Sequence, residues 1–496
     1  MLRSNQLRVC GDQREVSKTL GVRMVVQNHY DAIVIGSGHN GLIAAAYLAK
    51  AGQSVLVLEK NNYFGGATAS QRVFPDYDAM LSRYSYLVSL LPKQIVQDLD
   101  LRFETRRRTT ASFTPWTDSN GQQRGLVFSN VNESRSKESL LEMTGSHESW
   151  TRYREFLELQ TTIAKVIWPT MLSPLRSRQE FVRNLSTEQQ RQAWSRFIER
   201  PLGESIEEFA DHDALRGLLM TDGKIGVFTH PHDASLLQNR CFLYHIIGNE
   251  TGEWRVPVGG MKQLVTSLVG RCRELGVDML RDAPAIHVDA GLVTKSNATR
   301  SEVTFLQDGS ERTASAEHIL VNAAPNTFRT LLGQDYTPSK SDEGSVIKVN
   351  MLLKRLPKLK ASNISSEEGF AGSFHIDEGY EQMLESHAAA KAGEVPDPAP
   401  GEVYCHTLTD DSILSEDLRK RGFHTLTLFG LDMPWRLFES DHDERKEKVT
   451  ELYLEGLNRL TDEPFEDCLA TDHDGQLCIE TKTPQDLKRE VDLDQG

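Results

Sequence analysis

The stretch at residues 30–67, YDAIVIGSGHNGLIAAAYLAKAGQSVLVLEKNNYFGGA, constrains the fold of this chain more than any other part of the sequence. Its apolar run Ala32–Ile35 predicts a strand that is buried on both faces of a parallel sheet. The Ala- and Leu-rich segment Gly41–Lys50 predicts a helix that ends at Gly52, and Ser54–Leu58 predicts a second buried strand. A β-α-β unit of this kind predicts an α/β protein.

Three glycines stand between the first strand and the helix as Gly36-x-Gly38-x-x-Gly41. The first permits a tight turn, the second lets a pyrophosphate approach the backbone, and the third lets the helix pack closely on the sheet. The phosphates of a dinucleotide would then lie at the helix N-terminus, where free N–H groups and the helix dipole favour negative charge. We also expect Ser37 and Asn40, in the same turn, to contact the cofactor. The alternative is a glycine-rich strand–helix–strand that binds no nucleotide.

The identity of the nucleotide depends on the residues after the second strand. Glu59 ends that strand, where a carboxylate accepts hydrogen bonds from ribose hydroxyls and repels the 2′-phosphate of NADP, and Lys60 is a further candidate contact. Gly65-Gly66 extends the pattern as in flavoproteins of the glutathione-reductase-like type. The sequence holds no second GxGxxG for NAD(P)H and no close cysteine pair for a disulfide reductase. We therefore predict FAD.

Composition limits the other classes of function. A chain of 496 residues with net charge −15 is long enough for two or three domains and is an unsuitable partner for nucleic acid. Its one dense basic run, Arg106–Arg108, is expected to be the solvated edge of a strand. The six cysteines show no metal-ligand spacing, which predicts no metal site and reduced thiols.

The sequence shows no transmembrane run and no secretory signal, so we expect a cytoplasmic protein, with the mitochondrial matrix as the alternative. Residues 1–27 form a polar N-terminal extension, which is either a weak presequence or an artefact upstream of a true start at Met24.

Strand patterns return later in the chain. Two alternating stretches joined at Asp308-Gly309 predict a hairpin, and His318–Pro325 predicts a buried strand. The segment Glu378–Pro400 is expected to be an exposed helix that runs into a loop.

The fingerprint, together with four longer segments, resembles the phytoene dehydrogenase-like (carotenoid desaturase-type) FAD-dependent oxidoreductases. The four segments are Ser82–Leu101, Ser112–Trp116, Phe228–Gly248 and Val256–Leu268. The resemblance implies a discontinuous Rossmann-like FAD-binding domain with an inserted α+β substrate domain. The implied parts are the extension at 1–27, FAD-binding parts at 28–100 and 255–335, and substrate parts at 101–254 and 336–496.

The same resemblance implies a chemistry. Flavin N5 would accept a hydride from a C–H bond of an apolar or amphipathic small molecule, with oxygen or a quinone as the electron acceptor. Ile286, His287 and Val288 would lie on the strand against the adenine, and Ala323–Pro325 would pass near the flavin. Homo-oligomerisation is left open. Two rivals also stay open: a flavin amine oxidase, and a catalytically silent protein that keeps the fold.

One departure from the family concerns the C-terminal part. Members close the FAD site with a late glycine-rich segment, whereas Gly-Gly pairs occur here only at 65–66 and 259–260. We therefore expect a truncated product, or a second chain that supplies the segment, and substoichiometric FAD in the isolated chain.

Candidate residues near the chemistry are few. Tyr244 and His245 would face the flavin, with His245 acting as a base or orienting substrate, or His245 is a buried structural histidine. Arg83 would bind a phosphate or substrate acid, or form an ion pair between domains. His230–His232 is expected to be a loop rather than a metal site, and Cys241 a core residue.

Overall fold

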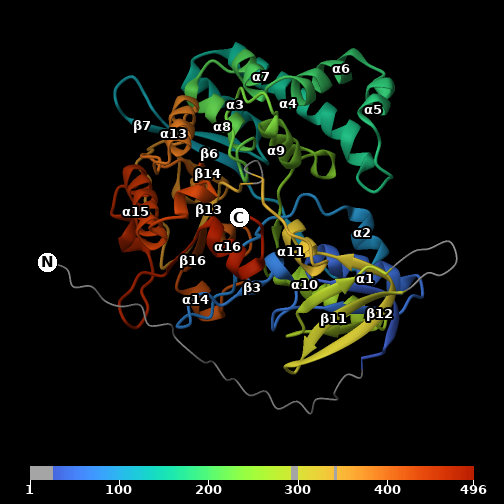
Figure 1. Cartoon of the computed structure of the whole chain (residues 1–496). Helices are drawn as coiled ribbons and strands as arrows, with labels where there is room; N and C mark the ends of the chain where they lie inside the picture. Colours follow the sequence, from blue (N-terminus) through green and yellow to red (C-terminus); the bar gives the residue numbers. More distant parts are fainter. Residues whose placement is uncertain (1–25, 292–299, 340–342, 496) are drawn as a thin grey trace.

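The computed structural model describes residues 26–291, 300–339 and 343–495, so Met24 and nearly all of the predicted N-terminal extension lie outside the described part. Two large sheets organise these residues (Figure 1). Within the described ranges, no helix is both long enough and apolar enough to cross a bilayer.

The first sheet has six strands in the order β10-β11-β12-β1-β2-β9. Its parallel part consists of β12, β1, β2 and β9, and β10, β11 and β12 form an antiparallel meander. The strands are β1 (His29–Ile35), β2 (Val55–Leu58), β9 (Asp278–Leu280), β10 (Ala285–Asp289), β11 (Ser301–Gln307) and β12 (Ser310–Val321). Because strands from residues 29–58 and 278–321 meet in one sheet, the predicted discontinuous α/β unit is confirmed.

Both faces of the parallel strands are covered, as the apolar run predicted. Ala32 and Val34 of β1 pack in one apolar cluster with helices α1 (His39–Lys50) and α10 (Lys262–Glu274), whereas Ile33 and Ile35 pack in a second cluster on the opposite face. This alternation has the period of two that a strand imposes on its side chains.

The meander confirms one prediction and corrects another. Asp308 and Gly309, both at positive φ, form the predicted hairpin turn between β11 and β12. The prediction of a buried run over His318–Pro325 is wrong in part, because Ile319–Val321 are only half-buried and His318 is exposed. The second half of β12 pairs with β1, whereas its first half pairs with β11, and the buried residues Ala314 and Ala316 lie in the part that pairs with β11.

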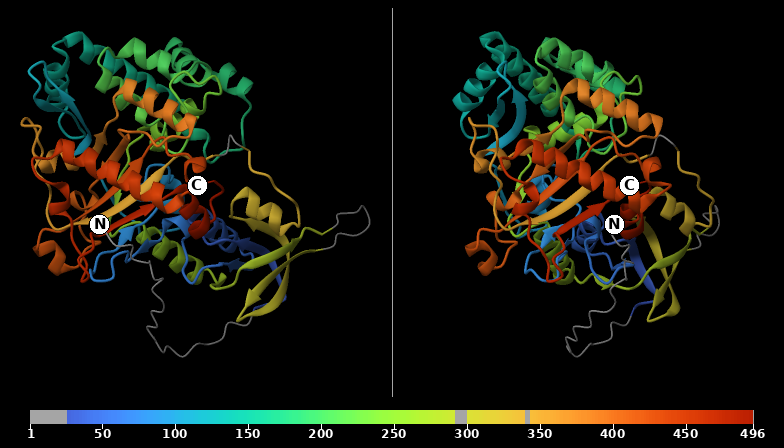
Figure 2. Two further views of the ribbon diagram at one scale, coloured as in Figure 1. Left: turned by 60° about the vertical axis from the view of Figure 1, so that its left-hand side comes forward. Right: turned by 90° about the vertical axis from the view of Figure 1, so that its left-hand side faces the viewer.

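The second sheet has seven strands in the order β17-β13-β16-β15-β14-β6-β7 (Figure 2). The strands are β6 (Thr110–Thr117), β7 (Gln123–Ser129), β13 (Ile347–Leu353), β14 (Ser373–Ile376), β15 (Gly401–Tyr404), β16 (His424–Gly430) and β17 (Ile479–Lys482). Along the chain, β6 and β7 precede the strands β9–β12 of the first sheet, and β13–β17 follow them. The chain therefore crosses between the two sheets repeatedly.

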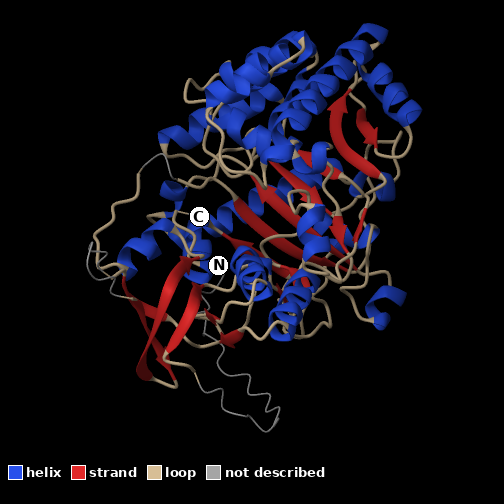
Figure 3. Ribbon diagram, turned by 90° about the vertical axis from the view of Figure 1, so that its right-hand side faces the viewer, coloured by secondary structure: helices blue, strands red, loops and turns tan. Residues whose placement is uncertain are grey.

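A group of helices covers one end of this sheet (Figure 3). It comprises α3 (Glu133–Thr144), α4 (His147–Ile167), α5 (Arg178–Asn184), α6 (Glu188–Trp194), α7 (Leu202–Phe209), α8 (Asp213–Thr221) and α9 (Leu237–Ile246). Helix α13 (Tyr380–Ala392) joins the group, and its face bearing Tyr380 and Met383 is buried against it. The expectation of an exposed helix at Glu378–Pro400 is therefore wrong, because α13 packs on α8 and its residues Tyr380, Met383 and Ala390 are buried.

The remaining elements lie between or after the strands of the two sheets along the chain. They are β3 (Ser70–Gln71), β4 (Leu81–Ser82), α2 (Lys93–Asp98), β5 (Thr105–Arg106), β8 (Val256–Pro257), α11 (Pro325–Leu331), α12 (Ser366–Phe370), α14 (Glu416–Lys420), α15 (His442–Leu460) and α16 (Pro484–Val491). Helix α15 packs its buried face, including Val449 and Tyr453, on the core of the seven-stranded sheet.

Candidate functional site

The turn between β1 and α1 requires glycine for measurable steric reasons. Gly36 has φ +94°, and a Cβ there would lie 2.4 Å from the carbonyl oxygen of Asn322. A Cβ at Gly41 would lie 2.3 Å from the oxygen of Gly36, and one at Gly38 would lie 2.8 Å from Asn322 Nδ2. The turn is thus clamped by the residue that follows β12, whose N–H donates to Ile35 O at 2.7 Å.

The N-terminus of α1 has the features of an anion-binding site. Its N-cap residue is Gly38, and no side chain caps the helix. Within the described ranges no acceptor is recorded for the N–H of His39 or Asn40, and both residues are exposed. Free N–H groups at the positive end of a helix bind phosphate. A glycine cradle in front of an uncapped helix therefore fits the pyrophosphate of a dinucleotide.

Glu59 holds this turn from the neighbouring strand. It is 4% exposed, and its Oε2 accepts hydrogen bonds from the Ser37 N–H at 3.0 Å and the Ser37 hydroxyl at 2.5 Å. Its Oε1 accepts from the N–H of Asn61 at 2.9 Å. Since a carboxylate has about four acceptor positions, contact with a ribose remains compatible with this structural role. That contact stays a prediction.

The glycine pair after β2 lies directly against the turn. Gly65 forms an isolated bridge with Gly38, and its N–H donates to Ser37 O at 3.0 Å. Its φ is +115°, and a Cβ would lie 2.6 Å from Val265 of α10. Gly66 also has positive φ and approaches Gly38. The structure thus brings the predicted glycines together in one place.

The other predicted cofactor contacts are more scattered. Lys60 is exposed and forms an ion pair with Asp492 at 3.5 Å, so the segment after α16 lies beside the turn. On β10, His287 is exposed, whereas the side chain of Val288 is buried in the apolar cluster with Ile33. The N–H of Ala283, just before β10, donates to Glu59 O at 2.8 Å, which places the start of this strand near the turn.

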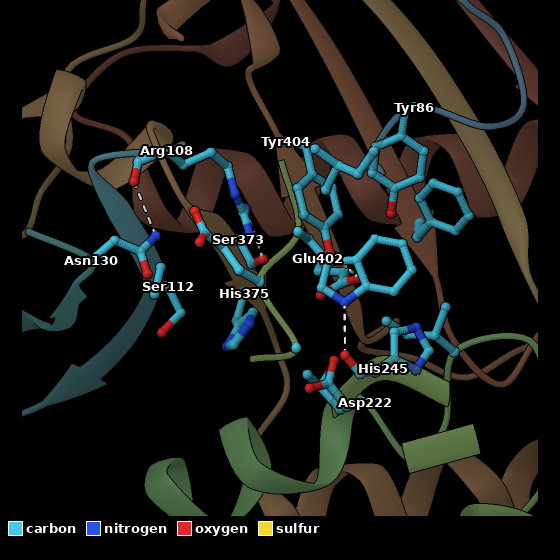
Figure 4. A pocket seen from close by; sticks show the side chains of 18 of the residues that line it. Tyr86, Arg108, Ser112, Asn130, Asp222, His245, Ser373, His375, Glu402 and Tyr404 are labelled. Carbon is cyan, nitrogen blue, oxygen red and sulfur yellow. Dashed lines mark hydrogen bonds between the residues drawn. The ribbon is translucent and has the colours of Figure 1, made fainter. Parts of the chain in front are cut away.

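A cavity of about 570 Å³ lies between the seven-stranded sheet and helices α8 and α9 (Figure 4). Its wall is formed by side chains from β6, β14, β15, β16, α8 and α9, and by the chain segments 84–87 and 251–254. The lining includes Tyr86, Arg108, Ser112, Asn130, Asp222, Tyr244, His245, Trp254, Ser373, His375, Glu402, Tyr404 and Phe429.

Buried acids make up one side of this cavity. Glu402 is 1% exposed, and burial raises its pKa to about 8, although a hydrogen bond from the hydroxyl of Tyr404 favours the ionised form. Burial also raises the pKa values of Asp222 and of the adjacent Glu378. Burial, and secondly the charge of Arg108, lowers the pKa of His375 to about 3. At neutral pH the imidazole of His375 is therefore uncharged, and Glu402 is predominantly protonated.

The predicted pair Tyr244 and His245 lies on α9 in the wall of this cavity. Tyr244 is 53% exposed. His245 is 9% exposed, and its Nδ1 lies 2.9 Å from the carbonyl oxygen of Cys241, to which Nδ1–H donates. The carbonyl of His245 accepts from Trp254 Nε1–H at 2.9 Å. His245 is thus a buried, hydrogen-bonded residue that also lines a cavity, and its catalytic role stays a prediction.

Arg83 does not reach the cavity. Its Nε donates to both carboxylate oxygens of Glu480 at 2.9 and 3.0 Å, and its Nη1 lies 3.3 Å from Glu490. This geometry matches the interdomain ion pair that the sequence left open, because it ties the segment after β4 to β17 and α16.

The expectation of a solvated Arg106–Arg108 run is wrong for its last member. Arg106 and Arg107 are half-exposed and pair with Asp410 and Glu253, but Arg108 is 9% exposed and lines the cavity. Three consecutive residues at the entry to β6 point in different directions, which the charge pattern alone does not show.

The remaining negative predictions concern metals and thiols. His230–His232 lies in a loop as expected. Among the described residues no group of His, Cys, Asp and Glu has a metal-binding arrangement, and the cysteines at 241, 272, 405, 468 and 478 are free and buried.

Sequence reasoning missed most of the cavity. Its residues come from distant parts of the chain: Tyr86, Arg108, His375 on β14, and Glu402 and Tyr404 on β15. One signal was present: a carboxylate inside the short apolar strand GEVY, residues 401–404, is unusual in a buried strand and indicates a special environment.

Comparisons with known proteins agree with this architecture. Residues 34–94 match the family model described as an NAD(P)-binding Rossmann-like domain. The uncharacterized protein Mb0921c of Mycobacterium bovis is 37% identical over 470 residues, which cover 94% of this chain and 86% of that protein. Pyridine nucleotide-disulfide oxidoreductase domain-containing protein 2 of Mus musculus is 27% identical over 510 residues, covering 93% and 82%.

Among solved structures, a putrescine oxidase bound to putrescine superimposes with a TM-score of 0.53 and 18% identity, covering 91% of this chain and 88% of the other. At this identity the likeness shows the fold alone. The predicted fold class, a Rossmann-like domain that is split along the chain and joined to a second domain, is confirmed.

Proposed function

The chain belongs to the family of the mycobacterial protein Mb0921c, and on that premise we propose that it is an FAD-dependent oxidoreductase. FAD lies along the β1–α1 turn, and an amphipathic small molecule is oxidised in the 570 Å³ cavity. The observation that carries the proposal is the glycine-clamped turn, with an uncapped helix behind it and Glu59 beside it.

The cavity has the position that such a reaction needs. Tyr86 lines it and also lines a small neighbouring cavity bounded by Ser82 and Gly260. Gly260 lies immediately before α10, which packs against α1. The substrate cavity thus adjoins elements of the FAD-binding half. FAD, when bound, supplies the acceptor for a hydride from a C–H bond.

The residues of the cavity supply binding and water exclusion. Its aromatic side chains, including Tyr86, Tyr404 and Phe429, cover an apolar substrate body. Glu402 is buried and protonated at neutral pH, so it can hold a proton in the cavity or give it up. The resemblance to phytoene dehydrogenase-like enzymes supports a desaturation-type reaction with oxygen or a quinone as acceptor.

A direct test is anaerobic titration of the FAD-loaded protein with candidate substrates, followed by absorbance near 450 nm. Bleaching that reverses when oxygen or a quinone is added supports the proposal and identifies the acceptor. If no amphipathic C–H donor bleaches the flavin, the catalytically silent alternative is favoured.

A second candidate is amine oxidation. The fold is shared with a putrescine oxidase, and the cavity is lined by the acids Asp222 and Glu402 as well as by several tyrosine rings. Bleaching by simple primary amines, but not by the corresponding alcohols or acids, would select this candidate.

A further inference from the structure

We infer that the substrate carries a carboxylate, and that Arg108 is the residue that binds it. The inference deepens the proposed function, because it assigns a chemical class to the ligand of the 570 Å³ cavity. It concerns binding, so it can be tested without turnover.

Arg108 is a buried cation without a counter-ion in the described part of the chain. Its side chain leads into the cavity and is 9% exposed. Its recorded polar contacts are one hydrogen bond from Nη1 to Ser373 Oγ at 3.2 Å and the approach of its Cζ to the Tyr404 ring at 5.6 Å. Among the described residues, its buried Nε–H finds no acceptor, and no carboxylate lies within 4.0 Å of the guanidinium.

Burying a guanidinium without a carboxylate partner destabilises the protein, unless a ligand supplies the missing negative charge. Arg side chains elsewhere in this molecule show the contrast: Arg83, less buried than Arg108, has Glu480 and Glu490 as partners. A planar guanidinium with free N–H groups matches a carboxylate in a bidentate arrangement. The unused donors of Arg108 therefore point to an acidic ligand.

The backbone around Arg108 is arranged to aim the side chain. Asn130 Nδ2 donates to the carbonyl of Arg108 at 3.0 Å, and the strand register shifts between Thr110 and Ser112 where β6 begins. Such an irregularity re-aims nearby side chains. Figure 4 shows Arg108 extending from the side of Asn130 toward Tyr404 and Glu402. Ser112 and Ser373 add hydroxyl groups on the same side of the cavity.

The nearby acids do not replace the missing counter-ion. Burial raises the pKa of Glu402 to about 8 and also raises that of Asp222, even though the charge of Arg108 favours their ionised forms. His375 and His406 are uncharged, because burial, and secondly the charge of Arg108, lowers their pKa values to about 3. A ligand carboxylate would thus meet the fixed positive charge of Arg108, the uncharged rings of His375 and His406, and Glu402, which is predominantly protonated at neutral pH.

The rest of the cavity defines the rest of the ligand. Tyr86, Tyr244, Trp254 and Phe429 present aromatic surface, which suits an apolar body. The class of ligand is therefore a small amphipathic carboxylic acid, with the acid group at Arg108 and the apolar part along the rings.

The test uses the full chain loaded with FAD and three probes of one shape: 3-phenylpropionate, 3-phenylpropylamine and 3-phenylpropanol. Binding is followed by quenching of tryptophan fluorescence, since Trp254 lies in the cavity wall, and by perturbation of the flavin spectrum. We expect 3-phenylpropionate to bind about tenfold or more tightly than the other probes.

Arg108→Gln should weaken 3-phenylpropionate binding about tenfold or more while leaving the weak binding of the alcohol unchanged, and Arg108→Lys should restore part of the loss. The matched control is Arg106→Gln, since Arg106 belongs to the same basic run but is half-exposed, paired with Asp410 and outside the cavity lining; it should change affinity less than about threefold. Circular dichroism and flavin content verify that each variant is folded.

Equal affinity for the three probes, no binding of 3-phenylpropionate, or a loss that is the same at Arg106 and Arg108 would overturn the inference. Failure of the proposed function looks different: acid binding through Arg108 would persist in a protein that binds no flavin or whose flavin no substrate reduces.

Discussion

The nucleotide turn and the cavity differ in how their buried polar side chains are paired. At the turn, Glu59 is satisfied by Ser37 and Asn61, and the glycines are fixed by Asn322 at distances that leave no space for a side chain. In the cavity, Arg108 keeps donors without acceptors among the described residues, and Glu402 is buried as an acid.

The difference shows which groups determine ligand specificity in each region. The side chains of the turn are rigidly held, and the free N–H groups at the start of α1 offer a ready-made backbone surface to a common cofactor. In the cavity, Arg108 has no counter-ion among the described residues. A ligand of negative charge can therefore gain binding energy from this cation. Four substitutions can break or sharpen this contrast.

The largest effect is expected at Gly36. Gly36→Ala places a Cβ 2.4 Å from Asn322 O at φ +94°, so the turn must open and FAD binding should be lost together with about 3 kcal/mol or more of stability. Flavin content and thermal unfolding measure both.

The control is Gly270→Ala on α10, where a Cβ meets nothing within 4 Å. It should stabilise the helix by about 0.5–1 kcal/mol and leave flavin content unchanged. Full flavin content in Gly36→Ala would show that the clamp is not required.

The next effect concerns the link between the two regions. Arg83→Met leaves Glu480 and Glu490 without their shared cation, which should lower the free energy of unfolding by about 2–4 kcal/mol, measured by urea denaturation. Arg72→Met, which breaks the exposed pair with Asp78, should cost less than about 1 kcal/mol. If Arg83→Met kept full stability but lost substrate binding, Arg83 would belong to the site instead.

Stability should depend on pH through Glu402. Burial raises the pKa of this acid in the folded protein to about 8, so the unfolded chain loses its proton first as pH rises. The wild type should therefore lose stability from about pH 4.5 to pH 8 relative to Glu402→Gln, with a difference near zero at pH 4.5 and on the order of 2–4 kcal/mol at pH 8.

Thermal unfolding of both proteins across this pH range measures the difference, and Glu385→Gln, at an exposed position on α13, should show none. A constant difference between wild type and Glu402→Gln at all pH values would mean that Glu402 is ionised in the folded protein.

The smallest effect is expected at Glu59. Glu59→Gln keeps an acceptor for Ser37, gives up the one for the partly buried Asn61 N–H and removes the charge near the predicted ribose, which should raise the dissociation constant for FAD about tenfold. The structure rules out Glu59→Ala as a clean test, because it would leave the buried Ser37 N–H without its acceptor. Glu302→Gln on exposed β11 is the control. Unchanged affinity in Glu59→Gln would remove Glu59 from the cofactor site.

The contrast also explains what the sequence could predict. The turn was predictable because Gly36, Gly38, Gly41 and Glu59 act within one β-α-β unit, where spacing fixes position. The split sheet was expected from the resemblance to a flavoprotein family, because the strand patterns after α10 predict further strands but not the sheet that they join.

The cavity was not predictable in the same way. Arg108 reads as the last residue of a charged run, and its burial depends on the packing of β6 beside β14, more than 250 positions later in the chain. Glu402 gave a local signal, a carboxylate in an apolar strand, but no sequence pattern connects it to Arg108. Only the tertiary fold brings them to one wall.

The central claim is that the β1–α1 turn binds FAD. The measurement that tests it most directly is the absorption spectrum of the purified chain before and after reconstitution with excess FAD, with the released cofactor identified by mass. The account predicts a yellow protein that carries FAD, filled or fillable to about one per chain, and a colourless Gly36→Ala variant. A wild-type chain that stays colourless after reconstitution, or that releases NAD(P) instead, would contradict it.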